Sequence, residues 1–454
     1  MKKIPIVCLC ILALSIGCHK QVVLLAQGWS MPTKFAETED SLGGGVVLYN
    51  WHSRILALQP QSDGAAKCYL LNSNDKSWAE VPFTGVPRGY LWYRPAIDQD
   101  SDRVLFDQSY KEDDKLVIAV LVGRVTVNGS LAVRDVAERK WTTDTKALFG
   151  ETRPDVRLSE PGRRIWPAFG MGVINGNDLY FPYSIGGVEV THNGKTLVVD
   201  GSKGPYANGV FHSTNSGTTW QMEKTPDSLG GLSSVVKTEN HFYCFAIKLV
   251  RNQKAQLWFT QRPAIDGSWV TPETITKSYG SDYVAVPQGD TIHLFWLDAL
   301  HEKRRGNPVY PHAGNYEVVY SQRKDSDASW SKDVILSEGL LYSYAPSVSV
   351  EGDKIVVAWA GVQTAGVWHS QFDPNDIFYV TSRDKGNTWT KPLRVTDNIK
   401  EGITAGDPQV VLLNGVIHLF YIQGKMDLQQ LSPGLTKLNQ PPWPIYYTQR
   451  PFPD

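Results

Sequence analysis

Residues Ser382–Trp389 read SRDKGNTW, and this short pattern recurs along the 454-residue chain. A second copy, STNSGTTW at 213–220, has Asn215 where the first has Asp384. Each copy predicts a tight turn between two strands, in which the Asp or Asn side chain caps backbone N–H groups and Gly takes a positive φ. The Trp that ends each copy is expected to pack beneath the hairpin.

Weaker copies of the pattern indicate a repeat fold. They end at Trp78, Trp269 and Trp330, and a very degenerate one ends at Trp141. Three apolar strands precede each turn; in the unit of Trp389 they are 347–350, 355–359 and 377–380. Such units, spaced ~50 to 80 residues apart, predict an all-β protein: a β-propeller of four-stranded antiparallel blades.

The two ends of the chain are expected to share one blade. Three C-terminal strands, the last at 445–448, end without a Trp, whereas GWSMP at 28–32 matches the segments that follow Trp330 and Trp389. The N-terminal strand around Trp29 should therefore complete the C-terminal blade and close the ring. Seven blades are preferred, and six is the alternative if the unit at Trp141 is irregular.

The composition is that of a folded domain without a strong charge. Hydrophobic residues make up 42% and charged residues 20%, and the net charge is -1. These values exclude global disorder and predict no nucleic-acid partner. No Cys/His cluster has zinc-ligand spacing, so neither a metal nor a cofactor is predicted. Cys68 and Cys244 fall in different repeats and are expected to be unpaired core residues. We expect a monomer.

Residues 1–18 predict a targeting segment that is not part of the fold. A basic start precedes an apolar run, Ile4 to Ile16, that is too short for a transmembrane helix. The run ends in LSIGC, which resembles a bacterial lipoprotein signal in which Cys18 is acylated. The alternative is an ordinary secretory signal cleaved nearby. We expect one propeller domain over 19–454, lipid-anchored in the cell envelope (outer membrane or periplasmic face) or secreted, with no membrane contact besides the anchor.

The two full turns and the strands around them resemble the Asp-box, or bacterial neuraminidase, repeats of the sialidase superfamily, over nearly the whole mature chain. This resemblance implies a propeller directed at glycans, in a group that includes sialidases, other glycosidases and non-catalytic binding proteins. The sialidases use an arginine triad, an Asp acid/base and a Tyr nucleophile paired with a Glu. The segment GGLSSVV at 230–236, where that Glu is expected, contains none. The sequence therefore predicts glycan recognition and leaves standard sialidase catalysis doubtful.

Long connections are expected to gather binding residues on one face of the propeller. These connections are 184–206, 298–315, 361–375 and 423–443. They and the starts of the blades supply the candidate ligand-binding residues Arg94, Arg164, Trp166, Asp298, Glu302, Arg304, Arg305, His312, Trp368 and His369. Of these, Arg164 and Trp166 belong to RIWP (164–167), which resembles the family's Phe-Arg-Ile-Pro motif. The alternative is a set of solvated loops with incidental charge.

Candidate catalytic groups stand at the starts of three blades. They are Asp282, Tyr342, Tyr344 and Asp407. Asp407 is expected at the start of an innermost strand, facing the central opening, as an acid/base; structural hydrogen bonding to a neighbouring blade is the alternative. Either Tyr is a candidate nucleophile, and aromatic packing is the alternative.

Three functions remain open at this point. The leading hypothesis is a surface-anchored propeller that recognises a glycan or oligosaccharide. The second is an exo-acting, sialidase-like glycoside hydrolase with a non-standard acid pair drawn from Asp407, Asp282, Asp298 and Glu302. The third is a non-catalytic scaffold for another envelope protein.

Overall fold

The structure is a computed structural model with 31 β-strands and no α-helix among the residues that it describes. These residues are 27–37, 46–51, 54–60, 66–71, 77–81, 83–84, 96–97, 103–112, 115–127, 131–144, 165–167, 173–192, 195–199, 208–226, 229, 232–250, 254–265, 267–276, 280–299, 316–340, 342–363, 375–398, 403–425 and 443–453. No helix long and apolar enough to cross a membrane occurs in these segments. The all-β class predicted from the sequence is confirmed.

The strands pair into seven sheets, numbered here in chain order. Sheet 1 consists of β2 (Val47–Trp51), β3 (Arg54–Pro60), β4 (Ala66–Leu71) and β5 (Trp78–Val81). Sheet 2 consists of β6 (Phe83–Thr84), β7 (Ala96–Ile97), β8 (Arg103–Glu112), β9 (Lys115–Val127) and β10 (Leu131–Asp144). Sheet 3 consists of β11 (Ile165–Pro167), β12 (Val173–Asn175), β13 (Asp178–His192), β14 (Lys195–Val199), β15 (Asn208–Ser213) and β16 (Gln221–Lys224).

The remaining sheets have four strands each. Sheet 4 consists of β17 (Leu232–Lys237), β18 (His241–Val250), β19 (Lys254–Pro263) and β20 (Glu273–Thr274). Sheet 5 consists of β21 (Gly280–Gln288), β22 (Thr291–Asp298), β23 (Glu317–Lys324) and β24 (Val334–Ile335). Sheet 6 consists of β25 (Tyr342–Glu351), β26 (Lys354–Val362), β27 (Asp376–Ser382) and β28 (Leu393–Arg394). Sheet 7 consists of β29 (Ile403–Leu413), β30 (Val416–Lys425), β31 (Pro444–Pro451) and β1 (Thr33–Glu37).

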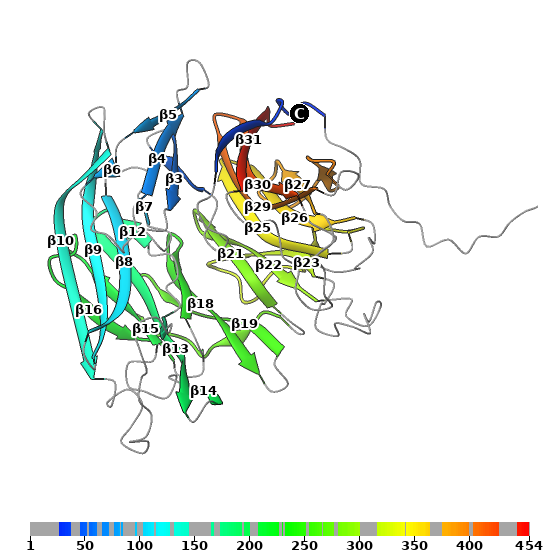
Figure 1. Cartoon of the computed structure of the whole chain (residues 1–454). Helices are drawn as coiled ribbons and strands as arrows, with labels where there is room; N and C mark the ends of the chain where they lie inside the picture. Colours follow the sequence, from blue (N-terminus) through cyan, green and yellow to red (C-terminus); the bar gives the residue numbers. More distant parts are fainter. Residues whose placement is uncertain are drawn as a thin grey trace, which may run out of the picture.

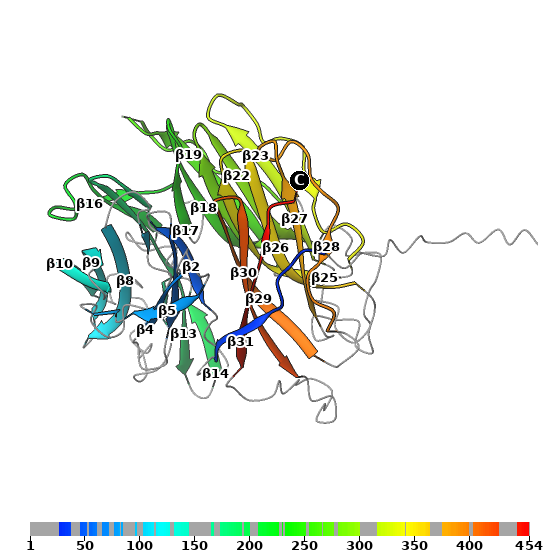
Figure 2. The same cartoon turned by 90° about the horizontal axis from the view of Figure 1, so that it is seen from above.

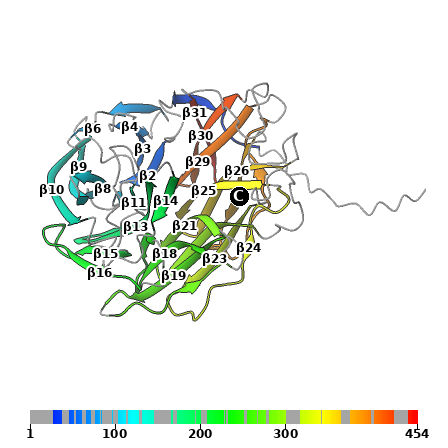
Figure 3. The ribbon, with the colours of Figure 1, turned by 60° about the horizontal axis from the view of Figure 1, so that its bottom comes forward.

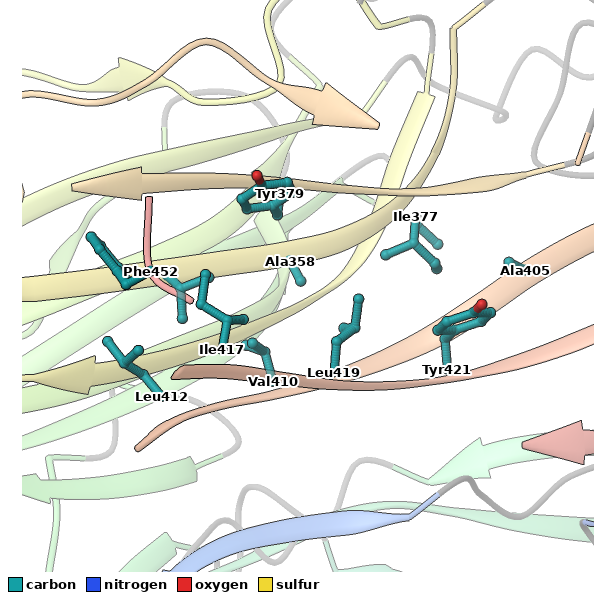
Figure 4. Packing of buried hydrophobic residues seen from close by; sticks show 12 residues of the cluster. Ala358, Ile377, Tyr379, Ala405, Val410, Leu412, Ile417, Leu419, Tyr421 and Phe452 are labelled. Atoms are coloured by element: carbon teal, nitrogen blue, oxygen red, sulfur yellow. The ribbon is translucent and has the colours of Figure 1, made fainter. Parts of the chain in front are cut away.

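The sheets follow one another in chain order around the middle of the molecule, with β2, β21, β25 and β29 toward that middle (Figure 3). Neighbouring sheets share apolar cores. Between sheets 6 and 7, for example, Ile377 and Tyr379 pack against Leu412 and Leu419, all almost fully buried (Figure 4). In this arrangement each sheet buries its apolar side chains against those of the next sheet.

The two full turn motifs share the hydrogen bond from a backbone N–H to the Asp or Asn side chain. In the turn between β27 and β28, the Asp384 carboxylate accepts from the Thr388 N–H at 2.8 Å and from the Thr388 hydroxyl at 2.7 Å. In the turn between β15 and β16, Asn215 accepts from the Thr219 N–H at 2.8 Å. The glycine has a φ of +83° at Gly386 and +85° at Gly217. The turn mechanism predicted from the sequence is therefore present in both copies.

The tryptophan of the Asp384 turn contacts the preceding sheet as well as its own turn. The Trp389 indole N–H donates to the Gly386 carbonyl at 3.0 Å. Its ring packs against Tyr320 of sheet 5, with ring centroids 4.9 Å apart. Similar pairs of a third-strand aromatic and the next Trp are Phe259–Trp330, Tyr379–Trp29 and Tyr447–Trp78. The Trp thus joins adjacent sheets, a role that the expectation of packing beneath its own hairpin did not include.

The capping of the Asp384 turn gives a first testable prediction. Asp384→Ala should lower the free energy of unfolding by about 1 kcal/mol, because the Thr388 N–H and the hydroxyls of Thr388 and Ser382 lose their acceptor. Asp384→Asn should cost only a few tenths, because Asn215 fills the same place in the other turn. Thermal unfolding of both variants measures the difference; equal losses would contradict the capping role.

The pH dependence of that effect has a defined sign. Desolvation alone raises the pKa of Asp384, but hydrogen bonds from Thr388 and Ser382 outweigh it, and the pKa is lowered. A lowered folded-state pKa contributes stability above the unfolded pKa, and that stability is lost as the pH falls through the folded value. The difference between wild type and Asp384→Ala should therefore shrink in acid.

The N-terminal segment pairs with the C-terminal strand. β1 runs antiparallel to β31, with Thr33 opposite Tyr447 (Figure 1 and Figure 2, where the blue strand lies beside β31). Before β1, the Ser30 N–H donates to the Gln449 carbonyl at 2.8 Å. Trp29 packs into the core between sheets 6 and 7. The pairing predicted from the repeat is present, and its regular part begins at Thr33, after the GWSMP segment.

Two expectations for the middle of the chain are wrong. Trp141 does not follow a turn, because it lies within β10 opposite Ile118 of β9. Part of the connection expected over 184–206 is regular sheet, because β13 extends to His192 and pairs with β14. Both segments contain β-branched or aromatic residues, which favour extended strands over turns. Cys68 and Cys244 are free and buried, as expected.

Candidate functional site

Three adjacent sheets carry the same irregularity in their first strand. In β21 the register shifts between Ser281 and Val284, in β25 between Tyr344 and Ser347, and in β29 between Gly406 and Gln409. In each case three steps along the first strand oppose two steps along its partner, so one extra residue forms a β-bulge. Bulges redirect side chains and are frequent beside active sites.

The bulges hold three residues in a left-handed backbone conformation. Their φ angles are +41° at Asp282, +51° at Ala345 and +46° at Asp407. This region costs a residue with a Cβ roughly 1–2 kcal/mol, and Asp bears it better than most because its short side chain bonds locally. None of the three is glycine, the residue that would adopt this conformation without cost. Strained conformations of this kind cluster at active and ligand-binding sites, so the three bulges mark a candidate site.

Both bulge carboxylates are open to solvent, whereas Ala345 is half-buried. Desolvation by the surrounding protein nevertheless raises the pKa of Asp282. Asp282 is therefore in contact with water but has protein packed around much of it. Such a group holds its proton to a higher pH than a free surface carboxyl does.

Tyr344 lies beside Asp407. Burial raises the pKa of the Tyr344 phenol far above its ordinary value, and the charges of Asp407 and Tyr342 raise it further. A Cβ placed on Gly406 would lie 3.2 Å from the Tyr344 hydroxyl oxygen, so that hydroxyl lies near the backbone next to Asp407. Tyr344 is therefore a neutral phenol at physiological pH, suited to hydrogen bonding and not to acting as a free phenolate.

Tyr342 stands one alternation earlier on β25. It is 9% exposed, and its ring contacts Tyr316 and Tyr344 at centroid distances of 5.5 Å and 5.7 Å. This arrangement matches the aromatic packing that the sequence left open as the alternative to a nucleophile. Tyr342 therefore packs against the ring of Tyr344.

The register between β25 and β29 brings these residues together. The N–H groups of Val410 and Leu412 donate to the hydroxyls of Ser347 and Ser349 at 3.0 Å and 2.8 Å. These contacts hold the two first strands side by side, so the Tyr344 end of β25 meets the Asp407 end of β29. On its other side β25 packs against β21, which carries Asp282. Four of the predicted candidates therefore lie on three consecutive first strands; Asp282 is placed by its strand only.

Asp298 is placed differently from its expected position in a polar loop. It ends β22, is 3% exposed and accepts a hydrogen bond from the Trp296 indole N–H at 3.2 Å. A buried carboxylate with an indole donor in its own strand is typical of a structural residue. This placement favours a structural role for Asp298 over the acid/base role for which the sequence made it a candidate.

The other predicted binding residues lie outside the described residues or are described by their backbone alone. Trp166 belongs to β11, and nothing is described of its side chain. Outside the described segments are Cys18, Arg94, Arg164, Glu302, Arg304, Arg305, His312, Trp368 and His369. Among the residues that are described, no cluster of His, Cys, Asp and Glu could hold a metal ion.

Sequence reasoning missed Asp376, which opens β27 with no exposed surface. Its carboxylate accepts hydrogen bonds from the Thr396 hydroxyl at 2.7 Å and from the Asn398 N–H at 2.8 Å. The signal was a charged residue directly before the apolar run IFYV at 377–380, because a buried charge requires partners.

No family model matches the sequence, and no curated protein matches it. Solved structures match at low identity, among them sialidases, other glycosidases and polysaccharide lyases. A GH43 protein from Bacillus licheniformis is 13% identical with a TM-score of 0.28, and the match covers 58% of this chain and 49% of that chain. The chain thus spans about half the length of that protein.

Two further structures match over more of their length. A PL25 ulvan lyase is 9% identical with a TM-score of 0.43, covering 88% of this chain and 92% of that one. The intramolecular trans-sialidase from Ruminococcus gnavus is 11% identical with a TM-score of 0.36, covering 91% and 96%. At these identities and scores, functional inference rests on the site itself.

Proposed function

We propose that this chain recognises glycans through the bulge ends of β21, β25 and β29. The observation that carries the proposal is the pair of exposed carboxylates, Asp282 and Asp407, held in strained conformations at equivalent places on sheets 5 and 7. Carboxylate oxygens accept hydrogen bonds from sugar hydroxyls, and aromatic rings such as that of Tyr344 combine an apolar face with a polar tip. The Asp-box resemblance of the turns supports the same ligand class.

We further infer that the seven sheets form a closed ring, a seven-bladed propeller. Apolar residues of sheet 1, including Val46 and Ala57, pack in one core with Phe420 and Tyr447 of sheet 7. The contact of Tyr447 with Trp78 repeats, between the last and first sheets, the aromatic–Trp pairing that joins sheets 5 and 6. In such a ring the three bulges would stand around one opening.

A glycan array followed by calorimetric titration of the best glycan tests the proposal. Asp407→Asn and Asp282→Asn should each weaken binding at least about tenfold, because each removes a charged acceptor. Asp353→Asn is the control, since Asp353 is an exposed acid of sheet 6 paired with Lys385 at 3.4 Å, in the β25–β26 turn. Unchanged affinity in both site variants, or an array without any bound glycan, would refute the proposal. Stoichiometric co-purification of an envelope protein would then favour the scaffold function.

A second candidate, an exo-acting glycoside hydrolase, is favoured by one observation. Burial raises the pKa of Asp282, the direction required of a general acid, while Asp407 is an exposed carboxylate on the other flank of β25. The two acids are one of the non-standard pairs that the sequence allows. Release of reducing sugar by the wild type, reduced in Asp282→Asn by a far larger factor than the affinity is, would establish this activity; binding without turnover would exclude it.

We also propose that the chain is held at the cell envelope by acylation of Cys18. Acyl chains supply roughly 0.8 kcal/mol per buried methylene, and Cys18 precedes all of the repeats. Cys18→Ser should move the protein from the membrane fraction to the soluble fraction without changing its melting temperature. A mutant that still requires detergent for extraction would overturn the anchor.

A further inference from the structure

The connection between β28 and β29 is held by one buried carboxylate. Asp376 accepts the hydrogen bonds from Thr396 and Asn398 through the same oxygen, Oδ1. The Arg394 guanidinium lies 3.5 Å from its other oxygen, Oδ2. Burial raises the pKa of Asp376, whereas the hydrogen bonds from Asn398 and Thr396 and the charge of Arg394 oppose that rise. This carboxylate therefore fixes the path of residues 396–398.

The residues around Asp376 hold the first three residues of β29. The Ile403 N–H donates to the Asn398 carbonyl at 3.3 Å, and the Ala405 N–H donates to the Asn375 carbonyl at 2.9 Å. The Asn375 N–H and side-chain amide both donate to the Thr404 hydroxyl at 3.2 Å. The first three residues of β29 are thus tied to Asn398 of the connection and to Asn375, the residue before Asp376.

Asp407 stands only two residues beyond Ala405. Its φ of +46° is maintained by the surrounding structure, because an isolated Asp prefers other conformations. The Tyr344 hydroxyl lies only 3.2 Å from the place that a Cβ on Gly406 would occupy. A shift of the start of β29 would therefore change the distance between Asp407 and Tyr344.

The corresponding places in sheets 4 and 5 show which part of this arrangement is specific. Hydroxyls of Thr276, Ser337 and Thr396 accept the N–H of Leu257, Val318 and Ile377, respectively, at 3.0 Å, 2.8 Å and 3.0 Å. That contact is common to the three sheets. The residue before the capped N–H is half-buried Gln256 in sheet 4 and half-buried Glu317 in sheet 5, but fully buried Asp376 in sheet 6.

We propose that Asp376 is a positioning residue for Asp407: through residues 396–398 it fixes the start of β29 and keeps the Asp407 carboxylate beside Tyr344. The functional meaning of this role rests on the glycan site proposed above. The role itself is a property of the free protein and needs no ligand to be measured.

The test is a titration of the Asp407 carboxyl by ¹³C NMR on the full chain, with its signal assigned by its loss in Asp407→Asn. Asp376→Ala should move the Asp407 midpoint by about half a pH unit or more, because the Tyr344–Asp407 contact is altered. Asp376→Asn should restore the midpoint, because the amide oxygen still accepts from Thr396 and Asn398. This conservative variant separates the hydrogen bonds from the charge of Asp376.

A second pair of variants covers the case in which Asp376→Ala does not fold. Thr396→Val removes one of the two donors to Asp376 and should shift the Asp407 midpoint in the same direction by a smaller amount. Thr276→Val removes the matching hydroxyl from sheet 4 and should leave the midpoint unchanged.

An unmoved Asp407 midpoint in Thr396→Val, or a shift in Asp376→Asn as large as that in Asp376→Ala, would overturn the positioning role. The titration uses no glycan, so its result does not depend on the proposed function. If the midpoint shifts as expected but the protein binds no glycan, the positioning role of Asp376 stands and only the proposed function is rejected.

Discussion

Deletion of residues 27–37 should abolish stable folding. The deletion exposes the edge of β31, which β1 covers. It also removes Trp29, which packs edge-on against Tyr379 with centroids 5.3 Å apart. Phe35 would be lost as well, and its ring contacts Trp78 of sheet 1 and Phe420 of sheet 7 at 5.3 Å and 4.9 Å. Loss of a packed aromatic ring costs about 3 kcal/mol, so two such losses approach the whole stability of a typical domain.

The measurement is the yield of soluble protein and its melting temperature. A chain that starts at residue 38 should aggregate through the open strand edge. A chain that starts at Gln27 keeps Trp29, Ser30 and β1 and should melt like the full mature protein. Trp29→Ala alone should lower the melting temperature substantially without preventing secretion. A chain starting at residue 38 that folds and melts like the full protein would rule out the role of the N-terminal strand.

Gly386→Ala should be the most destabilising single methyl addition in sheet 6. The φ of +83° strains any residue with a side chain. In addition, a Cβ at this position would overlap the Tyr320 hydroxyl and come within 2.6 Å of its Cζ atom. Tyr320 is 1% exposed, and its hydroxyl is hydrogen-bonded to His293 Nδ1 and to Gln322 at 2.9 Å each. A movement of the ring away from the added methyl would break these hydrogen bonds. We expect a loss of about 3 kcal/mol, combining backbone strain and overpacking.

Gly352→Ala is the matched control. Its φ is +56°, and nothing lies within 4 Å of the added Cβ, so only the backbone strain of about 1 kcal/mol applies. Denaturant unfolding of the two variants measures the difference, which reports the contact between the turn and Tyr320. Equal losses would contradict the close docking of the sheet 6 turn onto sheet 5.

The turns and the class of the fold could be predicted from the sequence because their causes are local. The caps by Asp384 and Asn215 act within four residues. Gly386 adopts a positive φ at little cost because glycine has no Cβ. The partner of each Trp could not be predicted in the same way, because Trp389 meets Tyr320, a residue of the preceding sheet. The prediction of a turn before Trp141 was wrong for a related reason, because Trp is also favoured inside a long strand such as β10.

The candidate site was predictable in part. Glycine–acid–proline at 406–408 led us to expect the start of a strand; β29 begins earlier, at Ile403, and Asp407 lies at a bulge within it. The bulge at Ala345 carried no such sign, because neither Ala nor the following Pro indicates a left-handed residue. Asp298 was misplaced because the end of β22 was expected to belong to the polar segment that follows it. Asp376 was overlooked because its partners, Thr396 and Asn398, come from the next connection.

The most direct test of the site is one pair of measurements on Asp407→Gly: thermal stability and affinity for the best glycan of the array. Glycine relieves the left-handed strain at φ +46°, so stability should stay level or rise by up to about 1 kcal/mol. Binding should be lost with the carboxylate. Ala345→Gly, at φ +51° on the neighbouring bulge, should show the same stability change with binding intact. An Asp407→Gly protein that is clearly destabilised and still binds its glycan as the wild type does would mean that Asp407 serves the fold and not the site.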